Sequence, residues 1–243
     1  MRGIFTHTDY PNIVNKFSLS SCDWSLFQNL HKDVSNNKCP ICEVELSDKV
    51  NAFDSATIDH FRPKSSSMYS GLKCEPKNYI LMCGLCNENY KQSNFPLLDE
   101  SKRAYHATSM IHVLNEDPLL FNPTEEDPLD FFELAFRITE QGGILELKRK
   151  PSITKNSYKY KRCEAMIRLF GLGYCHKNIH PSTEVKNCRI DILTRHHKTF
   201  IELAKSLSDK KTLALFFKDK NRIDELKKYG FFQFIMNKQF MIN

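Results

Sequence analysis

A chain of 243 residues, 41% hydrophobic and 26% charged, is long enough for one large domain or two small ones with a buried core. Its aromatic content of 12% excludes a disordered composition, and no run of about 18 apolar residues predicts a membrane-spanning helix. The formal net charge of +6 is compatible with a polyanionic partner, but it is equally ordinary for proteins that bind no nucleic acid.

The N-terminus and the cysteine count predict a cytoplasmic protein. Residues 1–7 contain no apolar core of a secretory signal, so the nine cysteines are expected to lie in a reducing compartment. An odd count argues against a framework made of disulfides alone, and paired cysteines in such a compartment are more often metal ligands or redox groups. Cys22, Cys74 and Cys163 are expected to be small buried side chains.

The first 37 residues predict one helix. Residues 1–22 have no clear period and are expected to be extended or irregular. Asp23 can cap a helix that ends at Asn36-Asn37. The apolar residues of this helix fall on one face: Trp24, Phe27, Leu30 and Val34.

Residues 38–96 have the order strand, loop, strand, helix. Thr57 and Ile58 favour a strand over Ala56–His60, a serine-rich loop follows at 62–72, and a second strand is expected over 78–82. A helix is expected to begin at 86–92. This segment therefore predicts a ββα unit.

The remainder of the chain predicts a hairpin followed by helices. Two strands at 131–138 and 144–148 flank Gln141-Gly142-Gly143, and a helix over 157–170 is stopped by Gly171. Two or three more helices are expected in 183–243. The predicted class is α+β. Its expected divisions are an N-terminal segment and helix (1–37), a ββα core (38–96) and a mainly helical C-terminal region with a β-hairpin (97–243).

Two Cys-x-x-Cys pairs frame the ββα segment, namely Cys39 with Cys42 and Cys83 with Cys86. Thiolates spaced in this way within two turns can complete a tetrahedron around zinc, which leaves no open position and makes the ion structural. A redox dithiol, or simply buried thiols, is the alternative. So small a unit has a thin core and would be stabilised by the metal.

Between the pairs lie residue types suited to phosphodiester hydrolysis. His60 can act as a base for water, whereas Asp59 and Asn87 offer the hard oxygen ligands that magnesium takes. Adjacent residues of a strand point to opposite faces, so either the strand is irregular after Ile58 or one of the two residues is misassigned. Asn78 is expected to tie the loop backbone and orient His60.

These residues resemble the signature of HNH endonucleases, in the variant with Asn at the last position. The stretch Ile58-Asp59-His60-Phe61-Arg62-Pro63-Lys64 is similar to the PtuB-like HNH proteins of Septu-type and retron-associated anti-phage systems. The same pattern includes Asn78-Tyr79, Cys83-x-x-Cys86-Asn87, Lys91, Phe95-Pro96-Leu97, Pro118-Leu119-Leu120, Asn122-Pro123 and Asp127-Pro128. The strong resemblance covers 38 to about 130; the remainder, including Leu169-Phe170-Gly171-Leu172, is weaker.

The resemblance implies a ββα-metal (HNH/His-Me finger) nuclease. In it His60 is the general base, Asp59 and Asn87 hold one Mg²⁺ (or Mn²⁺), and the four cysteines hold structural Zn²⁺. It also implies a PtuA-like ATPase partner and, in retron settings, a reverse transcriptase with its msDNA. The chain itself contains no Gly-x-x-x-x-Gly-Lys motif. DNA is the first expected target, with RNA such as tRNA as the alternative; a zinc-ribbon binding module without catalysis is the other candidate.

Several further groups have weaker patterns. Arg62, Lys64 and Lys91 can contact substrate phosphate, with a solvated loop as the alternative for the first two. Two charged groups can bind partners: a basic run, which can guide nucleic acid or be a solvated face, and an acidic cluster, which can face a protein. The basic run is Lys148-Arg149-Lys150, Lys155, Lys159, Lys161 and Arg162, and the acidic cluster is Glu125-Glu126-Asp127 with Asp130. Cys175-His176, His180 and Cys188 have metal-ligand types at loose spacing and are expected to be core or surface residues.

Overall fold

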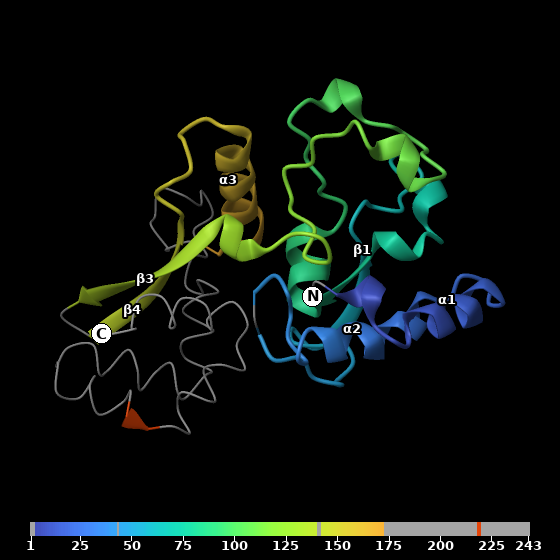
Figure 1. Cartoon of the computed structure of the whole chain (residues 1–243), viewed down its shortest axis with the longest axis horizontal. Helices are drawn as coiled ribbons and strands as arrows, with labels where there is room; N and C mark the ends of the chain where they lie inside the picture. Colours follow the sequence, from blue (N-terminus) through green and yellow to red (C-terminus); the bar gives the residue numbers. More distant parts are fainter. Residues whose placement is uncertain (1–2, 43, 140–141, 173–217, 220–243) are drawn as a thin grey trace. The chain divides into compact units, whose positions relative to one another are not determined.

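The computed structural model describes residues 3–42, 44–139, 142–172 and 218–219. These residues form a mixture of helices and short strands, so the predicted α+β class is confirmed (Figure 1). The chain divides into two compact units, Met1–Asp127 with Asn156–Phe170 and Pro128–Lys155 with Gly171–Asn243. The division expected from the sequence, with boundaries near 37 and 96, stays a prediction. None of the described helices is long and apolar enough to cross a bilayer.

The N-terminal segment contains a helix that the sequence analysis missed. Helix α1 spans Tyr10–Ser18, whereas residues 1–22 were expected to be extended or irregular. Pro11 lies in its first turn, where a missing N–H costs nothing. Ile13, Val14 and Phe17 then place apolar side chains on the hydrophobic core. The helix is only nine residues long, so tertiary packing rather than local propensity stabilises it.

The helix predicted after Asp23 is confirmed. Its first turn is a 3₁₀ helix, Trp24–Phe27, and α2 continues as Gln28–Val34. The Asp23 carboxylate accepts a hydrogen bond from the Ser25 N–H at 3.1 Å, which caps the first turn. Asn36 and Asn37 adopt positive φ angles of 53° and 57° and end the helix, as expected.

Strands β1 (Ala56–His60) and β2 (Tyr79–Cys83) form an antiparallel pair beside α2 (Figure 1). Pairing is regular from Ala56↔Cys83 to His60↔Tyr79, so the irregularity considered after Ile58 is not present, and the assignment of Asp59 and His60 to one site stays a prediction. Side chains therefore alternate between two faces. Ile58 and His60 pack on the Tyr79 side.

A π-helix, Leu85–Lys91, follows β2 directly and completes the order strand, strand, helix. The helix predicted at 86–92 therefore exists, with the i→i+5 hydrogen bonds of a π-helix. Thr57 and Asp59 contact residues of this π-helix, so the second face of β1 lies toward it.

Three aromatic rings form the core between the N-terminal helices and β2. The ring centroids of Phe17, Phe27 and Tyr79 lie 5.3 to 5.8 Å apart in edge-on or tilted arrangements. Such pairs stabilise a core by about 0.5–1.5 kcal/mol each beyond the area they bury. This cluster fixes the N-terminal segment against the strand that pairs with β1.

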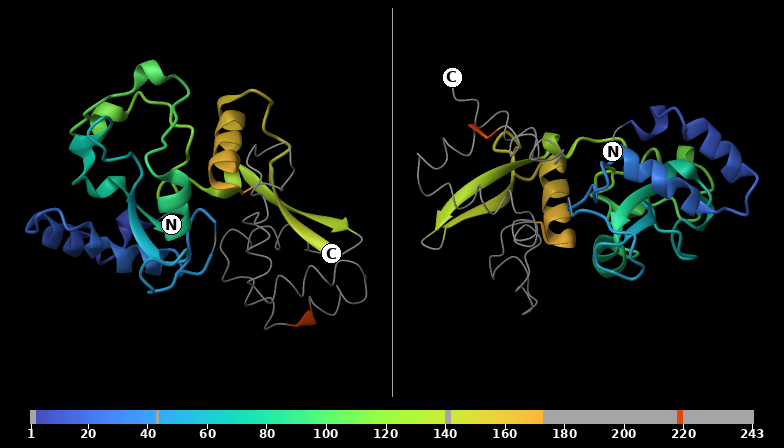
Figure 2. Two further views of the ribbon diagram at one scale, coloured as in Figure 1. Left: turned by 180° about the vertical axis from the view of Figure 1, so that it is seen from behind. Right: turned by 90° about the horizontal axis from the view of Figure 1, so that it is seen from below.

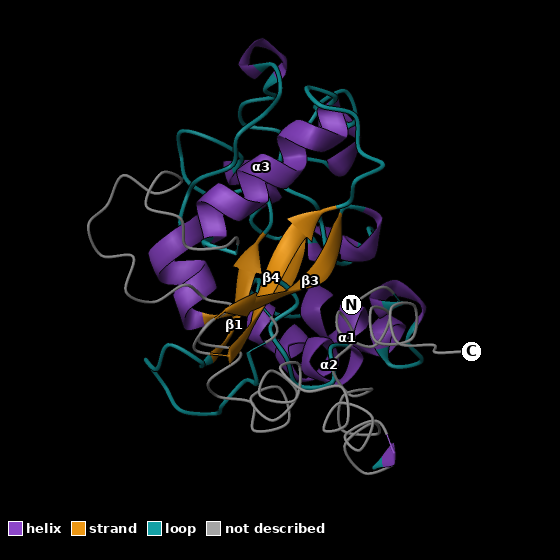
Figure 3. Ribbon diagram, turned by 90° about the vertical axis from the view of Figure 1, so that its left-hand side faces the viewer, coloured by secondary structure: helices purple, strands orange, loops and turns teal. Residues whose placement is uncertain are grey.

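The second unit contains the predicted hairpin (Figure 2). Strands β3 (Phe132–Thr139) and β4 (Gly142–Arg149) pair in antiparallel register from Phe132↔Arg149 to Thr139↔Gly142. The helix expected over 157–170 is α3, Tyr158–Phe170 (Figure 3), and Gly171 follows it with a positive φ of 63°. The helices expected in 183–243, and the residues Cys175, His176, His180 and Cys188, lie outside the described residues apart from 218–219.

Candidate metal centre and the neighbouring histidine

The two Cys-x-x-Cys pairs converge on one point. The Sγ atoms of Cys39, Cys42, Cys83 and Cys86 all lie within 4.8 Å of one another, and all four side chains are buried. The Sγ atoms of Cys39 and Cys86 are 3.6 Å apart, and those of Cys42 and Cys83 are 3.7 Å apart. A tetrahedron of thiolates with Zn–S bonds of about 2.3 Å has edges of about 3.8 Å. The cluster therefore fits a structural zinc ion.

Backbone geometry around the second pair supports the same function. The Cys86 N–H points to the Cys83 sulfur at 3.4 Å, which stabilises a thiolate there. A Cβ at Gly84 would lie 2.6 Å from the Ala52 carbonyl oxygen, so the tight turn requires glycine. Burial raises the pKa of the Cys39 and Cys86 thiols, so a bound cation must supply the free energy for their deprotonation.

On the π-helix face of β1, Asp59 meets a buried lysine. The ammonium group of Lys91 is inaccessible to solvent and lies 2.7 Å from Asp59 Oδ2. It also donates a hydrogen bond to the His60 carbonyl oxygen at 2.8 Å. The Asp59 contact is an ion pair at an angle outside hydrogen-bond geometry, so buried Oδ2 accepts no hydrogen bond. Oδ2 nevertheless faces the Lys91 ammonium group at close range, so the other carboxylate oxygen, Oδ1, is the atom left for a cation.

Asn87 reaches the same face. Its side-chain amide donates to Thr57 Oγ1 at 3.1 Å, and the Thr57 hydroxyl donates to the Met82 carbonyl at 2.9 Å. The amide nitrogen is thereby fixed, so the Asn87 carbonyl oxygen is the atom left to act as a ligand. Thr57 and Asp59 are two positions apart on β1 and share a face. Asp59 and Asn87 are therefore the residues that can hold a hard cation.

His60 lies on the opposite face at the end of β1. Its ring packs edge-on against Trp24 at 5.4 Å and Tyr79 at 5.1 Å, and the residue is 3% exposed. His60 Nε2 is 2.9 Å from the Lys73 carbonyl oxygen. A carbonyl only accepts, so Nε2 carries the hydrogen, and in the neutral ring Nδ1 holds the free lone pair. Burial lowers the pKa of His60, which favours this neutral form.

Asn78 connects the residues that follow β1. Its Oδ1 accepts from the Arg62 N–H at 2.8 Å, and its Nδ2 donates to the carbonyls of Arg62 and Leu72 at 3.0 and 3.3 Å. Asn78 is fully buried and lies next to Tyr79, the register partner of His60. The chain leaving His60 is therefore held by a side-chain amide.

Arg62 belongs to a buried polar network. Its guanidinium contacts the Glu116 carboxylate at 2.9 Å, and Glu116 also accepts from the Tyr69 hydroxyl at 2.8 Å and the Ala104 N–H at 2.9 Å. Arg103 donates to the same Tyr69 hydroxyl at 2.8 Å. Glu116 had no sequence signal, because its partner Arg62 lies 54 residues away. Substrate contact by Arg62 or by the buried Lys91 stays a prediction.

Lys64 has a different environment. It is exposed, and its ammonium group lies 3.9 Å from the centroid of the Trp24 ring. The ammonium group of Lys73 lies 5.8 Å from the same ring. Sequence reasoning placed Trp24 on an apolar helix face and did not single out Lys73. Only the long-range packing of three separate segments reveals this cluster.

Two of the cysteines expected to be small buried side chains form a disulfide instead. Cys22 and Cys74 are bonded, with Cα atoms 5.4 Å apart across a sequence separation of 52 residues. Cys74 is exposed and Cys22 partly so, which corrects the expectation for both. The sequence had no local spacing to indicate the bond. Cys163 is buried, as expected.

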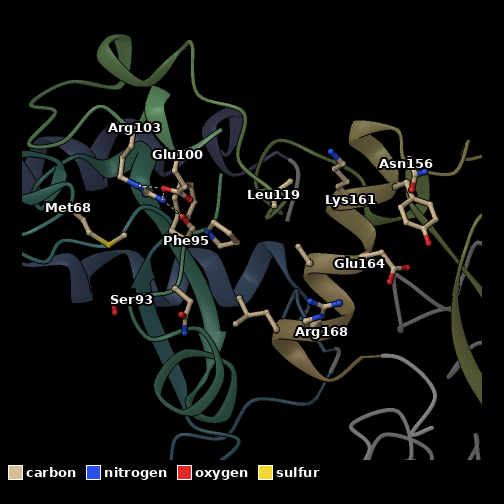
Figure 4. A pocket seen from close by; sticks show the side chains of 15 residues that line it. Met68, Ser93, Phe95, Glu100, Arg103, Leu119, Asn156, Lys161, Glu164 and Arg168 are labelled. Carbon is tan, nitrogen blue, oxygen red and sulfur yellow. Dashed lines mark hydrogen bonds and ion pairs between the residues drawn. The ribbon is translucent and has the colours of Figure 1, made fainter. Parts of the chain in front are cut away.

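Neither His60 nor Asp59 lines the cavity of about 830 Å³ that Figure 4 shows from close by. It is lined by the loop at 93–96, by Arg103 with its partner Glu100, and by the α3 residues Lys161, Glu164 and Arg168.

Arg162, a member of the expected basic run, is buried and ion-paired with Glu126 of the acidic cluster at 2.6 Å. The other basic residues stay a prediction as a nucleic-acid guide.

Comparison with known proteins gives one informative match. The chain is 30% identical over 155 residues to Septu protein PtuB of Bacillus mycoides (strain KBAB4). The match covers 59% of this chain and 48% of the relative, so it spans about half the length of that protein. No family model matches the chain, and no solved structure matches it significantly. The resemblance to PtuB-like Septu proteins is confirmed.

Proposed function

We propose that the chain is a metal-dependent HNH endonuclease that hydrolyses nucleic-acid phosphodiesters as the effector of a Septu-type anti-phage system. The observation that carries this proposal is the orientation of His60. Its Nε2–H is bonded to the Lys73 carbonyl, so Nδ1 is the nitrogen that can accept a proton. Phosphodiester hydrolysis needs a base held in one tautomer, and Asp59 and Asn87 on the other face of β1 offer ligands for the cation that it also needs.

The proposed reaction begins with water near His60 Nδ1. The imidazole takes one proton as the water oxygen forms a bond to phosphorus, the bond from phosphorus to the leaving oxygen breaks, and that oxygen takes a proton from solvent water. Asp59 and Asn87 would hold Mg²⁺, with Mn²⁺ as the alternative, and this ion supplies positive charge for the developing phosphate charge. His60 is the last residue of β1, so base and cation can reach a phosphate from the two faces of the strand end.

Lys91 contributes to this arrangement from inside the fold. It neutralises Asp59 and holds the His60 carbonyl, and so it fixes the backbone between the two residues. The four cysteines would hold Zn²⁺ at the other end of the hairpin, where Ala56 pairs with Cys83. The zinc thus stabilises the ββα-metal core and takes no part in the reaction.

We propose a PtuA-like ATPase as the partner, because the resemblance implies one and this chain contains no Gly-x-x-x-x-Gly-Lys motif. DNA is the proposed substrate. An RNA target within a retron complex, which would add a reverse transcriptase and msDNA, is the alternative outcome. A zinc-ribbon module without catalysis would bind nucleic acid without cutting it.

The test is a cleavage assay with the zinc-containing chain, alone and with its ATPase partner. DNA and RNA substrates are compared with and without magnesium. We expect magnesium-dependent cleavage that falls by about a hundredfold to ten-thousandfold in His60→Ala, the usual effect of losing a positioned base. His112→Ala removes an exposed histidine and should cleave normally. Folded His60→Ala with wild-type activity would remove His60 from the mechanism.

A further inference from the structure

We infer that Lys64, Lys73 and Trp24 form a phosphate-binding site next to His60, which receives the nucleic-acid backbone beside the bond to be cut. This inference rests on the proposed function for the position of the substrate. The three residues come from separate segments: the 3₁₀ turn before α2, the loop after β1 and the loop before β2.

Both lysines and the histidine share Trp24 as a neighbour. The ammonium groups of Lys64 and Lys73 lie 3.9 and 5.8 Å from the centroid of its ring. The same ring contacts the His60 imidazole edge-on, with centroids 5.4 Å apart. A cation over an indole face gains about 0.5–1 kcal/mol at exposed sites, which limits the motion of Lys64.

Lys73 is connected to His60 through its backbone as well. Its carbonyl oxygen accepts from His60 Nε2 at 2.9 Å and from the Tyr79 hydroxyl at 2.9 Å. The bond between Cys22 and Cys74 joins the chain two residues before Trp24 to the residue after Lys73. The position of this site and the orientation of the base are thus set by the same interactions.

The two lysine charges around the ring have no carboxylate partner among the described residues. Within the described residues, neither Lys64 nor Lys73 forms an ion pair with a carboxylate. Asp59 acts on Lys64 through its charge, but its carboxylate is already paired with Lys91. Burial and the charge of Lys73 lower the pKa of Lys64, so the two ammonium groups repel each other. An anion placed between them would relieve that repulsion.

The chemistry of the pair selects a phosphate. Two ammonium groups exclude a metal ion, and lysine binds phosphate as a point charge that is independent of base sequence. Backbone contacts of this kind fix the register of a nucleic acid on a protein and do not read its sequence. The site would therefore hold the substrate strand in place and leave the choice of sequence to other contacts.

The experiment measures binding separately from cleavage. The full-length, zinc-containing chain is titrated with a short fluorescent single-stranded DNA, without added magnesium, over a series of salt concentrations. In Lys64→Gln/Lys73→Gln we expect affinity to fall about tenfold, and the slope of log K against log salt to flatten by about 0.7 for each phosphate that is no longer neutralised. Lys16→Gln/Lys49→Gln removes the same charge at two other exposed lysines and should bind like the wild type.

The contribution of the Trp24 ring is tested separately. Trp24→Phe keeps a ring beneath Lys64 and should retain most of the affinity, whereas Trp24→Leu should bind about two- to fivefold more weakly with zinc content unchanged. The double variant Lys64→Arg/Lys73→Arg keeps both positive charges, so the slope of log K against log salt should equal that of the wild type. Equal affinity and slope in the Gln double variant and in its control would overturn the inference, as would wild-type binding by Trp24→Leu.

The two proposals fail in different ways. If no nucleic acid is cut under any condition but the Gln double variant still loses binding, the nuclease is wrong and the phosphate site stands. If cleavage depends on His60 but the Gln double variant binds DNA like the wild type, the proposed phosphate site is wrong and the proposed nuclease activity is supported.

Discussion

The two ends of the β1–β2 hairpin are stabilised in different ways. At one end Ala56 pairs with Cys83, and four thiols converge on a site for zinc. At the other end His60 pairs with Tyr79, aromatic rings pack on the imidazole, and its Nε2 bonds to the carbonyl of Lys73, next to the Cys22–Cys74 disulfide in the chain. Five-residue strands place the ends about 13 Å apart, at about 3.3 Å per residue.

The difference shows that one end of the hairpin is determined by short local motifs and the other by contacts between residues far apart in the sequence. Each thiol pair is set by four consecutive residues, and a bound metal ion would join the two pairs. The histidine end depends on Trp24, Lys73 and Glu116, which come from three separate parts of the chain. We therefore expect damage at the zinc end to be global, and damage at the histidine end to be graded and separable.

The largest effect is expected from Cys83→Ser. Structural zinc contributes about 10–16 kcal/mol of apparent binding free energy in small peptides, so losing one thiolate should release zinc and abolish cooperative unfolding of the first unit. Zinc content and circular dichroism measure this. Cys163→Ala alters a buried cysteine outside the cluster and should keep the metal. Full zinc content in folded Cys83→Ser would show that the site does not need four thiolates.

Glu116→Ala tests the polar network that follows β1. The substitution leaves buried Arg62 without its carboxylate, and breaking such a pair costs about 3–5 kcal/mol of unfolding free energy. Denaturant titration provides the value, and zinc content should not change. The adjacent Asp117→Ala breaks a surface pair with Lys102 and should cost less than about 1 kcal/mol. Equal costs would mean that burial of the network has no energetic consequence.

The pH dependence of stability tests the packing behind the histidine end. Burial lowers the pKa of His31 to about 4, and its ring packs on Phe27, which contacts Tyr79. The folded pKa lies below the unfolded value of about 6.5, so between these values the unfolded chain takes up the proton. Stability is therefore lost as pH falls through this window.

Denaturant titrations at pH 7 and pH 4.5 should show this loss as about 2–3 kcal/mol more in the wild type than in His31→Leu. Both proteins carry the same thiol cluster, so its protonation cancels in the difference. Parallel losses in the two proteins would rule out His31 as the cause.

The smallest expected effect comes from Gly84→Ala at the zinc end. The added methyl group would lie 2.6 Å from the Ala52 oxygen and 2.8 Å from Ser55 Oγ, so the turn must shift. Overpacking of this kind costs about 2 kcal/mol. Because the four thiolates remain, the variant should still bind zinc, with weaker affinity in a chelator competition. Unchanged affinity and stability would show that the turn can move freely.

Residues 38–96 were predictable because their signals are short. The two thiol pairs, the strand bounds at Ala56 and His60, and the helix after Cys86 each follow from a few consecutive residues. Helix α1 was missed because nine residues with three apolar positions are too few for a clear period. Cys22 with Cys74 and Arg62 with Glu116 could not be paired either, since nothing in a sequence marks contacts more than 50 residues apart.

The chain contains a disulfide, Cys22–Cys74, and a cluster of four thiols, and the two require opposite redox conditions. A thiol reductant keeps Cys39 and its three companions able to bind metal, yet it cuts the covalent link that joins the segments bearing Trp24 and Lys73. Oxidants preserve that disulfide but can oxidise the four thiols, which then cannot bind metal as thiolates. Preparations made with and without dithiothreitol are thus chemically distinct samples, and comparing them would separate the two kinds of sulfur.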